Sequence, residues 1–485
     1  MILQSFKRTF KQPNQKDIWT VYFFDNLKKY SERNAIITEH GERISYKELL
    51  NEISRVEKYI ANKRTRVFLI SDNNYEFIIS YYALLKKRSI VFLLNSKITY
   101  QKLEQLTNIY FPEMIFDCSE NLERNIKKYF IHQNLKKLKI LKAIKKVRCK
   151  SDIELAQLIS TSGSTGSPKF VKQSYKNIEI NTKDIVDALK LNKNDITLTT
   201  MDPSYSYGLT KINSHIYVGG SIVLNKKTVF EKDFWNKIEN FSVTNFGGVP
   251  FFFEMLKKLK FHSLNLSSIK HISQAGGKLN IEVLKYLKKE LKKLKIKFYV
   301  MYGQTEAGPR ITVLDHKYFN TNYESVGKPI GKIKLWIQNK ENKIKEPNTI
   351  GELYCKGKNV MLGYASKLND LKKKRSSYEI KTGDLAYIDK KGFVYIKGRS
   401  KRIVKPFGIR VDLSELENFL DEYNFKNCIC IGDDKKINIY SKYESESEEI
   451  KDLIFKKLKI KKKIFYFLKI ERTPRDANGK ILFKL

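Results

Sequence analysis

Residues 158–169 read Leu158-Ile159-Ser160-Thr161-Ser162-Gly163-Ser164-Thr165-Gly166-Ser167-Pro168-Lys169, an apolar run followed by a loop of serine, threonine and glycine that ends at a lysine. Glycine lets backbone N–H groups converge on an anion, hydroxyl groups add donors, and lysine adds a point charge. The spacing differs from the GxxxxGK[ST] nucleotide loop, because Gly166 is followed by Ser-Pro-Lys. The stretch therefore predicts a phosphate-binding loop of another type, with a flexible surface loop as the alternative.

Helix and strand signals alternate on both sides of this loop. Short apolar runs predict strands at 66–70, 90–94, 114–116, 196–200, 221–224, 245–246, 271–273 and 298–301. Amphipathic or apolar segments between them predict helices that open at Tyr46 and cover 76–85, 100–109 and 283–294. Alternating strands and helices with short loops indicate an α/β fold with a mostly parallel sheet.

The pattern changes toward the C-terminus. Segments 351–355 and 393–396 are typical of antiparallel strands. The last part predicts a compact α+β unit, with strands at 403–404 and 428–431 and helices at 413–421 and 446–458. We therefore predict two domains, residues 1–398 and 399–485.

Composition limits the classes of function. The chain has 485 residues, and its 41% hydrophobic and 12% aromatic content excludes disorder as the main state. The net charge is 93 − 52 = +41, but only 16 of the 93 basic residues are arginine and the lysines are scattered. Sequence-specific nucleic-acid binding is therefore disfavoured, whereas weak binding of polyanions stays open.

Neither a disulfide framework nor a membrane protein is indicated. Five widely spaced cysteines are an odd number without zinc-ribbon spacing. The first residues lack an apolar signal region, and no apolar run approaches the length of a membrane span. We expect a reduced, cytoplasmic protein with no membrane span.

Five further segments complete a set of motifs. They are Met301-Tyr302-Gly303-Gln304-Thr305-Glu306, Gly351-Glu352-Leu353 with Gly363-Tyr364, Lys381-Thr382-Gly383-Asp384, Gly398-Arg399-Ser400-Lys401 with Gly408-Ile409-Arg410-Val411, and Pro474 with Asn478-Gly479-Lys480-Ile481. With the loop at 161–169, they resemble the motifs of the adenylate-forming ligases: acyl-CoA synthetases, luciferases and the adenylation domains of peptide synthetases. The resemblance follows the family's order and spacing over nearly the whole chain. It implies that the first predicted domain comprises two α/β subdomains and a small barrel-like part, and that the second is a small mobile α+β lid.

The resemblance implies an ATP site. The residues it assigns to the nucleotide are Thr161, Ser162, Gly163, Ser164, Thr165, Gly166, Lys169, Gly276, Gly277, Tyr302, Asp384 and Arg399. An aromatic ring such as Tyr302 can stack on adenine. Asp384 follows a glycine turn, where a carboxylate can accept two ribose hydroxyls with help from Arg399, although a turn-capping aspartate is the alternative.

The family's chemistry implies a second group of residues. Lys480, Glu306 and Thr305 are the catalytic residues, and Glu306 is also the ligand of Mg²⁺ beside the phosphates. Lys401 is the hinge about which the lid turns, and Gly408 belongs to the loop that faces the site during thiol transfer.

The acid-binding residues are expected to be Tyr205, Ser206, Gly248 and Gly303. Tyr205 lies where relatives carry an aromatic or histidine residue. Ser206 stands where activators of α-amino acids carry an aspartate, and a buried ammonium without a counter-charge is costly. An α-amino acid is therefore disfavoured, although nearby Asp202 leaves room for an alignment shift. The run 251–253 is expected to belong to the core, with an acyl tunnel as the alternative.

The predicted function is that of an ATP-dependent acid–thiol ligase. A carboxylate and ATP give an acyl-adenylate, which then forms a thioester with CoA or with the phosphopantetheine of a possible acyl-carrier-protein partner. Short hydroxy or branched acids and medium-chain fatty acids are candidate substrates. The alternatives are an α-amino-acid adenylating enzyme, an inactive relative, and a basic protein that binds nucleic acid. The inactive relative is disfavoured because Glu306, Asp384, Arg399 and Lys480 are all present.

Overall fold

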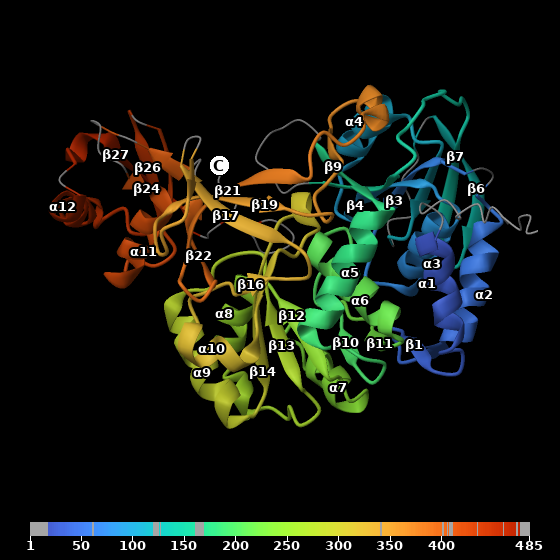
Figure 1. Ribbon diagram of the computed structural model, residues 1–485, viewed down its shortest axis with the longest axis horizontal. Helices are drawn as coiled ribbons and strands as arrows, with labels where there is room; N and C mark the ends of the chain where they lie inside the picture. The colour runs from blue at the N-terminus through green and yellow to red at the C-terminus, as the bar shows by residue number, and fades with distance from the viewer. Residues whose placement is uncertain are drawn as a thin grey trace, which may run out of the picture.

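The structure is a computed structural model that describes residues 18–60, 63–119, 126, 128–160, 169–339, 342–399, 402–404, 406, 411–433, 435–458, 460–471 and 474–475. Two large sheets with helices between and outside them form most of the chain (Figure 1). Among the described residues no helix is both long and apolar enough to cross a bilayer.

The first large sheet has nine strands. They are β1 (Asn34–Ile37), β2 (Arg43–Ser45), β10 (Ile196–Leu198), β11 (Ser221–Val223), β12 (Asn245–Gly248), β13 (His271–Gln274), β14 (Lys297–Tyr302), β15 (Thr312–Leu314) and β16 (Lys328–Pro329). Their order is β16-β15-β14-β13-β12-β10-β11-β1-β2, and the six strands from β14 to β1 run parallel. The ends β2, β15 and β16 pair antiparallel.

The second large sheet has eight strands. They are β3 (Arg66–Ile70), β4 (Ile90–Leu94), β5 (Met114–Asp117), β6 (Tyr129–Leu135), β7 (Leu138–Ala143), β8 (Leu155–Ser160), β9 (Phe170–Ser174) and β20 (Gly363–Ala365). The order is β20-β9-β8-β4-β3-β5-β7-β6, with a parallel centre of β8, β4, β3 and β5. Every residue of β3 and β4 is buried, as continuous apolar runs in a parallel sheet require.

Ten helices of the described chain cover these sheets. They are α1 (Ile18–Lys28), α2 (Tyr46–Glu57), α3 (Tyr75–Lys86), α4 (Tyr100–Tyr110), α5 (Tyr175–Leu189), α6 (Ser206–Val218), α7 (Lys232–Asn240), α8 (Pro250–Lys258), α9 (Ile281–Lys293) and α10 (His316–Asn322). The main core joins α1, α2, α3, α5 and α6 to both sheets. A second core packs α7–α10 on the nine-stranded sheet, and a third packs α4 on the eight-stranded sheet.

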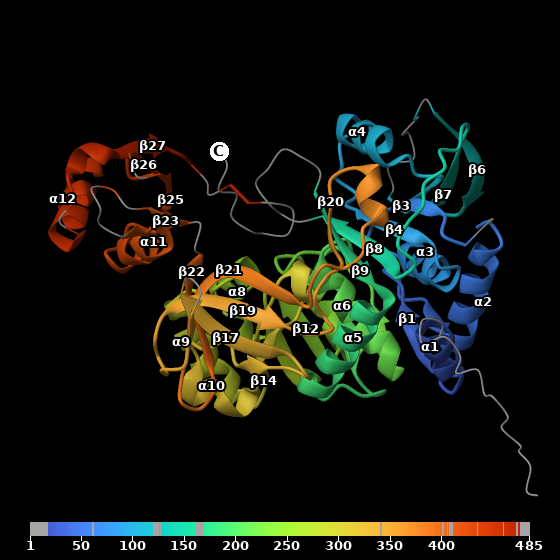
Figure 2. The ribbon, with the colours of Figure 1, turned by 45° about the horizontal axis from the view of Figure 1, so that its top comes forward.

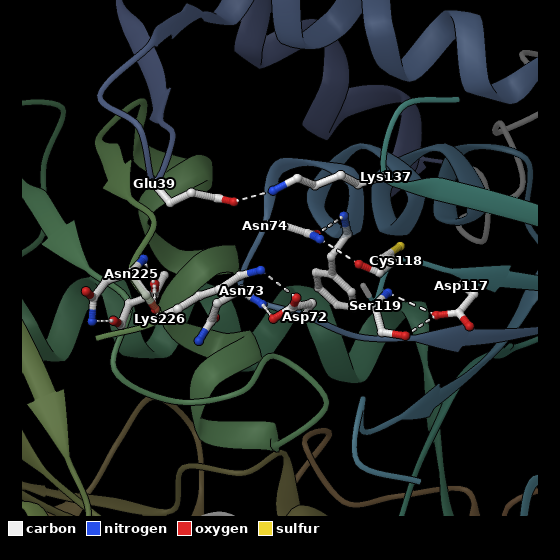
Figure 3. A network of polar contacts seen from close by, with 12 residues as sticks. Glu39, Asp72, Asn73, Asn74, Asp117, Cys118, Ser119, Lys137, Asn225 and Lys226 are labelled. Carbon is white, nitrogen blue, oxygen red and sulfur yellow. Dashed lines mark hydrogen bonds and ion pairs between the residues drawn. The ribbon is translucent and has the colours of Figure 1, made fainter. Parts of the chain in front are cut away.

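Two ion pairs tie the sheets together (Figure 3). Glu39, just after β1, pairs with Lys137 between β6 and β7 at 2.8 Å, and Lys226, after β11, pairs with Asp72, after β3, at 2.7 Å. Although burial raises the pKa of Glu39, the ammonium groups of Lys137 and Lys226 lower it below its ordinary value. These contacts fix one subdomain against the other.

A small antiparallel sheet and a C-terminal unit complete the fold. The sheet is β18-β17-β19-β21-β22, formed by β17 (Lys334–Asn339), β18 (Asn342–Ile344), β19 (Gly351–Lys356), β21 (Glu379–Ile388) and β22 (Val394–Arg399). The C-terminal elements are β23 (Ile403–Val404), β24 (Val411–Asp412), α11 (Leu413–Glu422), β25 (Ile429–Gly432), β26 (Ile437–Ser441), α12 (Ser447–Leu458) and β27 (Phe465–Lys469). They share a core of their own and lie together beside the end of β22 (Figure 2).

The α/β fold expected from the sequence is confirmed, and the predicted strands and helices are present within a few residues of their bounds. The strands β19 and β22 do belong to one antiparallel sheet, with β21 between them. The hairpin of β6 and β7 was not predicted; the residues of β6 are mostly exposed and give little apolar periodicity.

Candidate active site

The carboxyl end of β14 is the centre of the candidate site. Tyr302 ends this strand, and a short 3-10 helix, Thr305–Ala307, follows almost at once. Gly303 lies between them because there is no room for a side chain: a Cβ atom there would lie 1.8 Å from the carbonyl oxygen of Pro309. The close approach of these two backbones makes a compact turn that presents Tyr302, Thr305 and Glu306 together.

Tyr302, Asp384 and Arg399 form a hydrogen-bonded cluster across three strands. The Tyr302 hydroxyl donates to Asp384 Oδ2 at 2.5 Å, and Arg399 Nε lies 2.8 Å from Oδ1. Asp384 on β21 stands opposite Arg399 on β22, so strand register brings this pair together. The Asp384 side chain is 5% exposed and the Arg399 side chain is 63% exposed. A ligand can therefore reach the guanidinium, while the carboxylate that holds it is buried.

The local backbone at Asp384 is a bulge in a strand instead of the simple glycine turn expected. Tyr354 pairs with Lys381 and Glu352 with Leu385, so Thr382, Gly383 and Asp384 lie between the two pairs without register partners in β19. The Thr382 hydroxyl donates to the Leu353 carbonyl at 2.8 Å and accepts from the Asp384 N–H at 3.2 Å, which pins the bulge. Burial raises the pKa of Asp384, and the Arg399 charge opposes that rise.

Tyr364 contacts both Glu306 and Lys169. Glu306 Oε1 accepts a hydrogen bond from the Tyr364 hydroxyl at 3.0 Å, and Lys169 Nζ lies 3.4 Å from the centre of the Tyr364 ring. Lys169 ends the phosphate-loop stretch, and Tyr364 lies in β20, which pairs with β9 directly after that stretch. Burial and the Glu306 charge raise the pKa of Tyr364, so its hydroxyl stays a proton donor.

Thr305 contacts the predicted acid-binding segment. Its Oγ1 lies 3.1 Å from Ser206 Oγ, and Ser206 is the first residue of α6. Tyr205 precedes the helix and is partly exposed. Asp202 already has hydrogen-bond partners outside this contact: its Oδ1 accepts from the Ser71 hydroxyl at 2.6 Å and from the Ser204 N–H at 2.7 Å.

The remaining predicted residues, Gly276, Gly277 and Gly248, lie at the ends of the neighbouring strands β13 and β12. Gln274 Nε2 donates to the Gly277 carbonyl at 2.7 Å and closes the loop that contains Gly276. Beside Gly248 lies the ring of Phe252, 2.5 Å from where a Cβ would be, so this ring occupies the space next to that glycine. Phe253 is fully buried against Phe298, which supports the core interpretation of the 251–253 run for this residue.

Several predictions lie outside the described residues. They concern Thr161, Ser162, Gly163, Ser164, Thr165, Gly166, Lys401, Gly408 and Lys480. The described residues on either side of this stretch are Ser160, at the end of β8, and Lys169, whose Nζ lies over the Tyr364 ring.

A buried chain of side-chain hydrogen bonds, which we call the glutamine relay, ends at the Thr305 carbonyl. Tyr82 donates to Asn213 (3.0 Å), Asn213 to Tyr81 (3.4 Å), Tyr81 to Gln157 (2.8 Å), Gln157 to Gln173 (2.7 Å), and Gln173 to the Thr305 carbonyl (2.8 Å). All five side chains are at most 5% exposed, and every donor points the same way, so the bonds polarise one another. The relay connects α3 and α6 in the core to the turn that carries Thr305 and Glu306.

We expect Gln173→Met to slow adenylate formation by about tenfold, because small misplacements of reacting groups are costly. The Gln157 amide would also lose its acceptor, at about 1–3 kcal/mol for an unsatisfied buried group, and the Thr305 carbonyl would keep only the Gly308 N–H at 3.5 Å. Single-turnover adenylation and thermal unfolding measure both effects. Gln133→Met is the matched control, because Gln133 is partly exposed on β6 and, among the described residues, its side chain donates only to the Asn134 carbonyl. If Gln173→Met lowers the unfolding temperature but leaves the adenylation rate normal, the relay contributes to folding only.

Sequence reasoning missed the relay and the role of Tyr364. Gln157 and Gln173 lie in adjacent strands and show no local pattern, since their pairing depends on the register of β8 and β9. Tyr364 was noted only as part of a motif; its contact with Glu306 spans 58 residues of sequence.

The residues present suit a magnesium ion that is shared with phosphates. Within the described chain no three His, Cys, Asp or Glu side chains could hold a metal by themselves. Mg²⁺ in phosphate-transfer sites is held by only one or two carboxylates together with substrate phosphates and water. Glu306 is such a single carboxylate, partly exposed and beside the end of the phosphate loop.

Comparison with known proteins gives a family and a fold. A family model described as AMP-binding enzyme matches residues 23–365. The 2-succinylbenzoate–CoA ligase of Staphylococcus epidermidis is 24% identical over 409 residues, 82% of this chain and 81% of that protein. The enzyme of the same name from Bacillus subtilis is 24% identical over 471 residues, 93% and 94% of the two chains. A 4-coumarate–CoA ligase of Humulus lupulus is 27% identical over 362 residues, 68% of this chain and 64% of its own.

Solved structures show the same architecture. O-succinylbenzoate coenzyme A synthetase from Bacillus subtilis, in complex with AMP, superposes with a TM-score of 0.77 at 21% identity, covering 95% of this chain and 96% of that chain. ATP-bound MatB from Rhodopseudomonas palustris superposes with a TM-score of 0.74 at 18% identity, covering 96% and 97%. The large N-terminal part and small C-terminal unit are therefore those of a known fold.

Proposed function

Since this chain belongs to the AMP-binding enzyme family, the adenylate-forming ligases, we propose that it is an ATP-dependent acid–thiol ligase that makes an acyl-CoA. The observation that carries the proposal is the Tyr302–Asp384–Arg399 cluster beside Thr305 and Glu306. It offers an aromatic ring, an anchored carboxylate and a cation, which together suit an adenine nucleotide. The relatives named above act as CoA ligases by name, which supports the same activity here.

The first half-reaction joins the acid to AMP. A carboxylate oxygen of the acid attacks the α-phosphorus of ATP, the bond from that phosphorus to the bridging oxygen breaks, and pyrophosphate leaves with the electron pair. Thr305 donates its hydroxyl to the α-phosphate, Lys169 lies near the departing charge, and Lys480 neutralises the approaching oxygens. Glu306 would hold Mg²⁺, which would supply additional positive charge for the phosphates.

The second half-reaction transfers the acyl group to a thiol. The sulfur attacks the acyl carbonyl carbon, AMP leaves with the bonding electrons, and the thiol proton passes to solvent. We propose that the C-terminal unit from residue 399 onward turns about Lys401 and brings Gly408 to the site for this step. CoA is the favoured acceptor because the named relatives are CoA ligases, and those names give no support to a carrier protein or to a fatty acid substrate.

The test is pyrophosphate release by the purified chain with ATP, Mg²⁺ and a panel of carboxylic acids, followed by mass spectrometry with CoA and with holo-carrier proteins. Acid-dependent release and an acyl-CoA product are expected. Release with no acid dependence, or a product found only on the carrier protein, would contradict the proposal.

We expect acids without an α-amino group to be activated about tenfold or more better than their α-amino counterparts, because a desolvated ammonium would lack a counter-charge. Ser206 offers only a hydroxyl, already against Thr305, and Asp202 is held by Ser71 and Ser204. Pyrophosphate release with matched pairs of α-amino acids and their deamino analogues measures this preference. Ser206→Asp should reduce the difference in rate between the two acids of each pair. A wild-type preference for the amino acids would support the amino-acid alternative.

A further inference from the structure

An arginine of the C-terminal unit contacts helix α8 of the N-terminal part. Arg475, which follows β27, places Nη2 3.5 Å from Glu254 Oε2 and Cζ 4.6 Å from the centre of the Phe251 ring. Glu254 and Phe251 are three residues apart on α8, so they lie on one face of that helix. The guanidinium therefore contacts a carboxylate and an aromatic ring together, and we call this contact the α8 clamp.

A second contact between the two parts lies at the start of α9. Asn280 caps this helix by accepting from the Glu282 N–H at 2.7 Å, and its side-chain amide donates to Asp421 Oδ2 of α11 at 3.3 Å. Helices α8 and α9 pack against each other. The C-terminal unit therefore docks on the side of the N-terminal part that carries these two helices (Figure 2).

The strength of the α8 clamp suits a contact that forms and breaks. The Arg475 and Glu254 side chains are 18% and 29% exposed, so water reaches both charges. Among the described residues, the apolar core of the C-terminal unit contains members of that unit alone. Ion pairs and cation–π contacts at partly exposed sites shift an equilibrium by about tenfold or less. Such a contact can favour one orientation of the unit and still open in each catalytic cycle.

The clamp lies next to the predicted acid- and nucleotide-binding residues. Helix α8 begins at Pro250, two residues after Gly248 at the end of β12. A Cβ on Gly277 would lie 3.0 Å from Pro250 Cγ, so the loop after β13 touches the same end of α8. Phe251, whose ring contacts Arg475, is the second residue of this helix. Arg475 is therefore held at the edge of the candidate site.

The sequence connects the clamp to Lys480, the predicted cation of the adenylation step. Lys480 follows Arg475 by five positions, and five residues span at most about 18 Å. Fixing Arg475 at α8 therefore keeps the chain that carries Lys480 within a short distance of the candidate site. This restraint is lost when the clamp opens.

We propose that Arg475 is a positioning residue for adenylate formation: the α8 clamp holds the C-terminal unit in the orientation that presents Lys480 to the acid and ATP, and it opens for the thiol step. This inference rests on the proposed ligase function. Arg475 acts through the orientation of the unit and not through contact with a substrate. Loss of the clamp should therefore lower the fraction of molecules in the adenylating orientation and leave the site itself intact.

The two half-reactions test this role. Arg475→Met should slow single-turnover adenylate formation by about tenfold, because the docked orientation becomes less populated. Thioester formation from chemically supplied acyl-adenylate and CoA should be unchanged or faster, and Tm should change little. Lys436→Met is the matched control: its ammonium lies 4.4 Å from the Tyr466 ring centre within the C-terminal unit, so both half-reactions should stay normal. Equal losses in both half-reactions of Arg475→Met, or a large fall in its Tm, would show a packing role and overturn the inference.

Rescue by the partner separates the clamp from a local effect of Arg475. Glu254→Gln should slow adenylation in the same direction and add little to Arg475→Met, since both variants break one contact. Exchange of the two charges, by Arg475→Glu together with Glu254→Arg, should recover part of the rate that each single reversal loses. Fully additive losses in both pairs of variants would mean that the two side chains act independently, contrary to the proposal.

A crosslinking measurement reports the docked orientation without activity. Asn280→Cys and Asp421→Cys are combined in a Cys149→Ser background, because the other four cysteines of the chain are buried. Arg475→Met should slow disulfide formation between the two new cysteines by about tenfold. The crosslinked protein should form acyl-adenylate and make no thioester until it is reduced. Thioester formation at the normal rate while crosslinked, or loss of adenylation on crosslinking, would show that the docked orientation is not the adenylating one.

Failure of the proposed function gives a different result from failure of this inference. If no acid supports pyrophosphate release in the wild type, the ligase proposal fails. The crosslinking rates then decide whether Arg475 holds the C-terminal unit at α8. Equal rates with and without Arg475→Met overturn the inference, whatever the activity of the protein.

Discussion

Glu306→Gln should slow adenylate formation by roughly 10²-fold or more, the typical loss when one preorganised electrostatic group is removed from an active site. The amide keeps the shape and can still accept the Tyr364 hydroxyl, which lies 3.0 Å from Glu306 Oε1 in the wild type. It removes the charge that would bind Mg²⁺ beside the phosphates. The loss should therefore appear in the chemical step and in the magnesium dependence of the rate.

Folding should depend little on this charge. Glu306 is partly exposed, and its backbone carbonyl accepts from the Met361 N–H at 2.9 Å whichever side chain is present. The measurement is single-turnover adenylation against Mg²⁺ concentration, together with thermal unfolding. Glu231→Gln is a control, because Glu231 also accepts a hydroxyl bond, from Thr228, but lies at the start of α7. A large loss of stability with little kinetic loss would instead show that Glu306 serves a structural ion pair or hydrogen bond.

Tyr364 provides a second variant at the same place. Tyr364→Phe keeps the ring against Lys169 and removes only the hydroxyl that Glu306 accepts. Because the carboxylate charge remains, its effect on the adenylation rate should be much smaller than that of Glu306→Gln. Comparable losses in the two variants would mean that orientation of Glu306, and not its charge, limits the rate.

The architecture could largely be predicted from the sequence, because its strands and helices follow from local patterns of apolar residues. Short runs rich in β-branched and other apolar residues, such as 66–70 and 90–94, are typical of buried strands in a parallel sheet, and both are fully buried. Bounds were accurate where a cap marks the end: Ser45 and Glu48 form a reciprocal capping box at the start of α2. The exposed hairpin strand β6 has no such pattern and was missed.

The site was predicted by resemblance of motifs, and geometry adds what motifs do not contain. Tyr302 and Asp384 are 82 residues apart, and only the packing of β14 against β21 places their side chains at hydrogen-bond distance. The same holds for Glu306 and Tyr364, which are 58 residues apart and meet only because β20 lies beside the Thr305–Ala307 turn. Such contacts cannot be recognised from a sequence, since they are defined by the fold.

The second large effect is expected at Lys480, where alanine should abolish formation of the acyl-adenylate from acid and ATP. Two negative groups, the carboxylate and the α-phosphate, must approach each other in this step. An ammonium with three donors and a compact charge can bridge their oxygens. Lys169, the described lysine of the phosphate-loop stretch, has its Nζ over the Tyr364 ring, so the proposal assigns a different cation to the reacting oxygens.

The same variant should hardly change the second half-reaction. After the adenylate has formed, the charge repulsion that Lys480 relieves is gone, and the proposal has the C-terminal unit turned so that Gly408 faces the site. Thioester formation from chemically supplied acyl-adenylate and CoA should therefore stay within a few-fold of wild type. Lys480→Arg tests whether charge alone suffices, because the wider guanidinium changes the geometry.

The alternative for Lys480 is one more solvated lysine near a chain end, where substitution costs little. Lys463 is a suitable control in the same unit: Lys463→Ala removes a positive charge from the 3-10 helix Lys462–Ile464 without a predicted catalytic role. If Lys480→Ala and Lys463→Ala both leave adenylation intact, Lys480 has no catalytic role. If Lys480→Ala impairs both half-reactions equally, the substitution affects the fold or nucleotide binding. The proposal that the C-terminal unit uses one orientation for adenylation and another for thioester formation is then wrong. Loss confined to adenylation is the result that requires a cation present in one orientation and absent from the other.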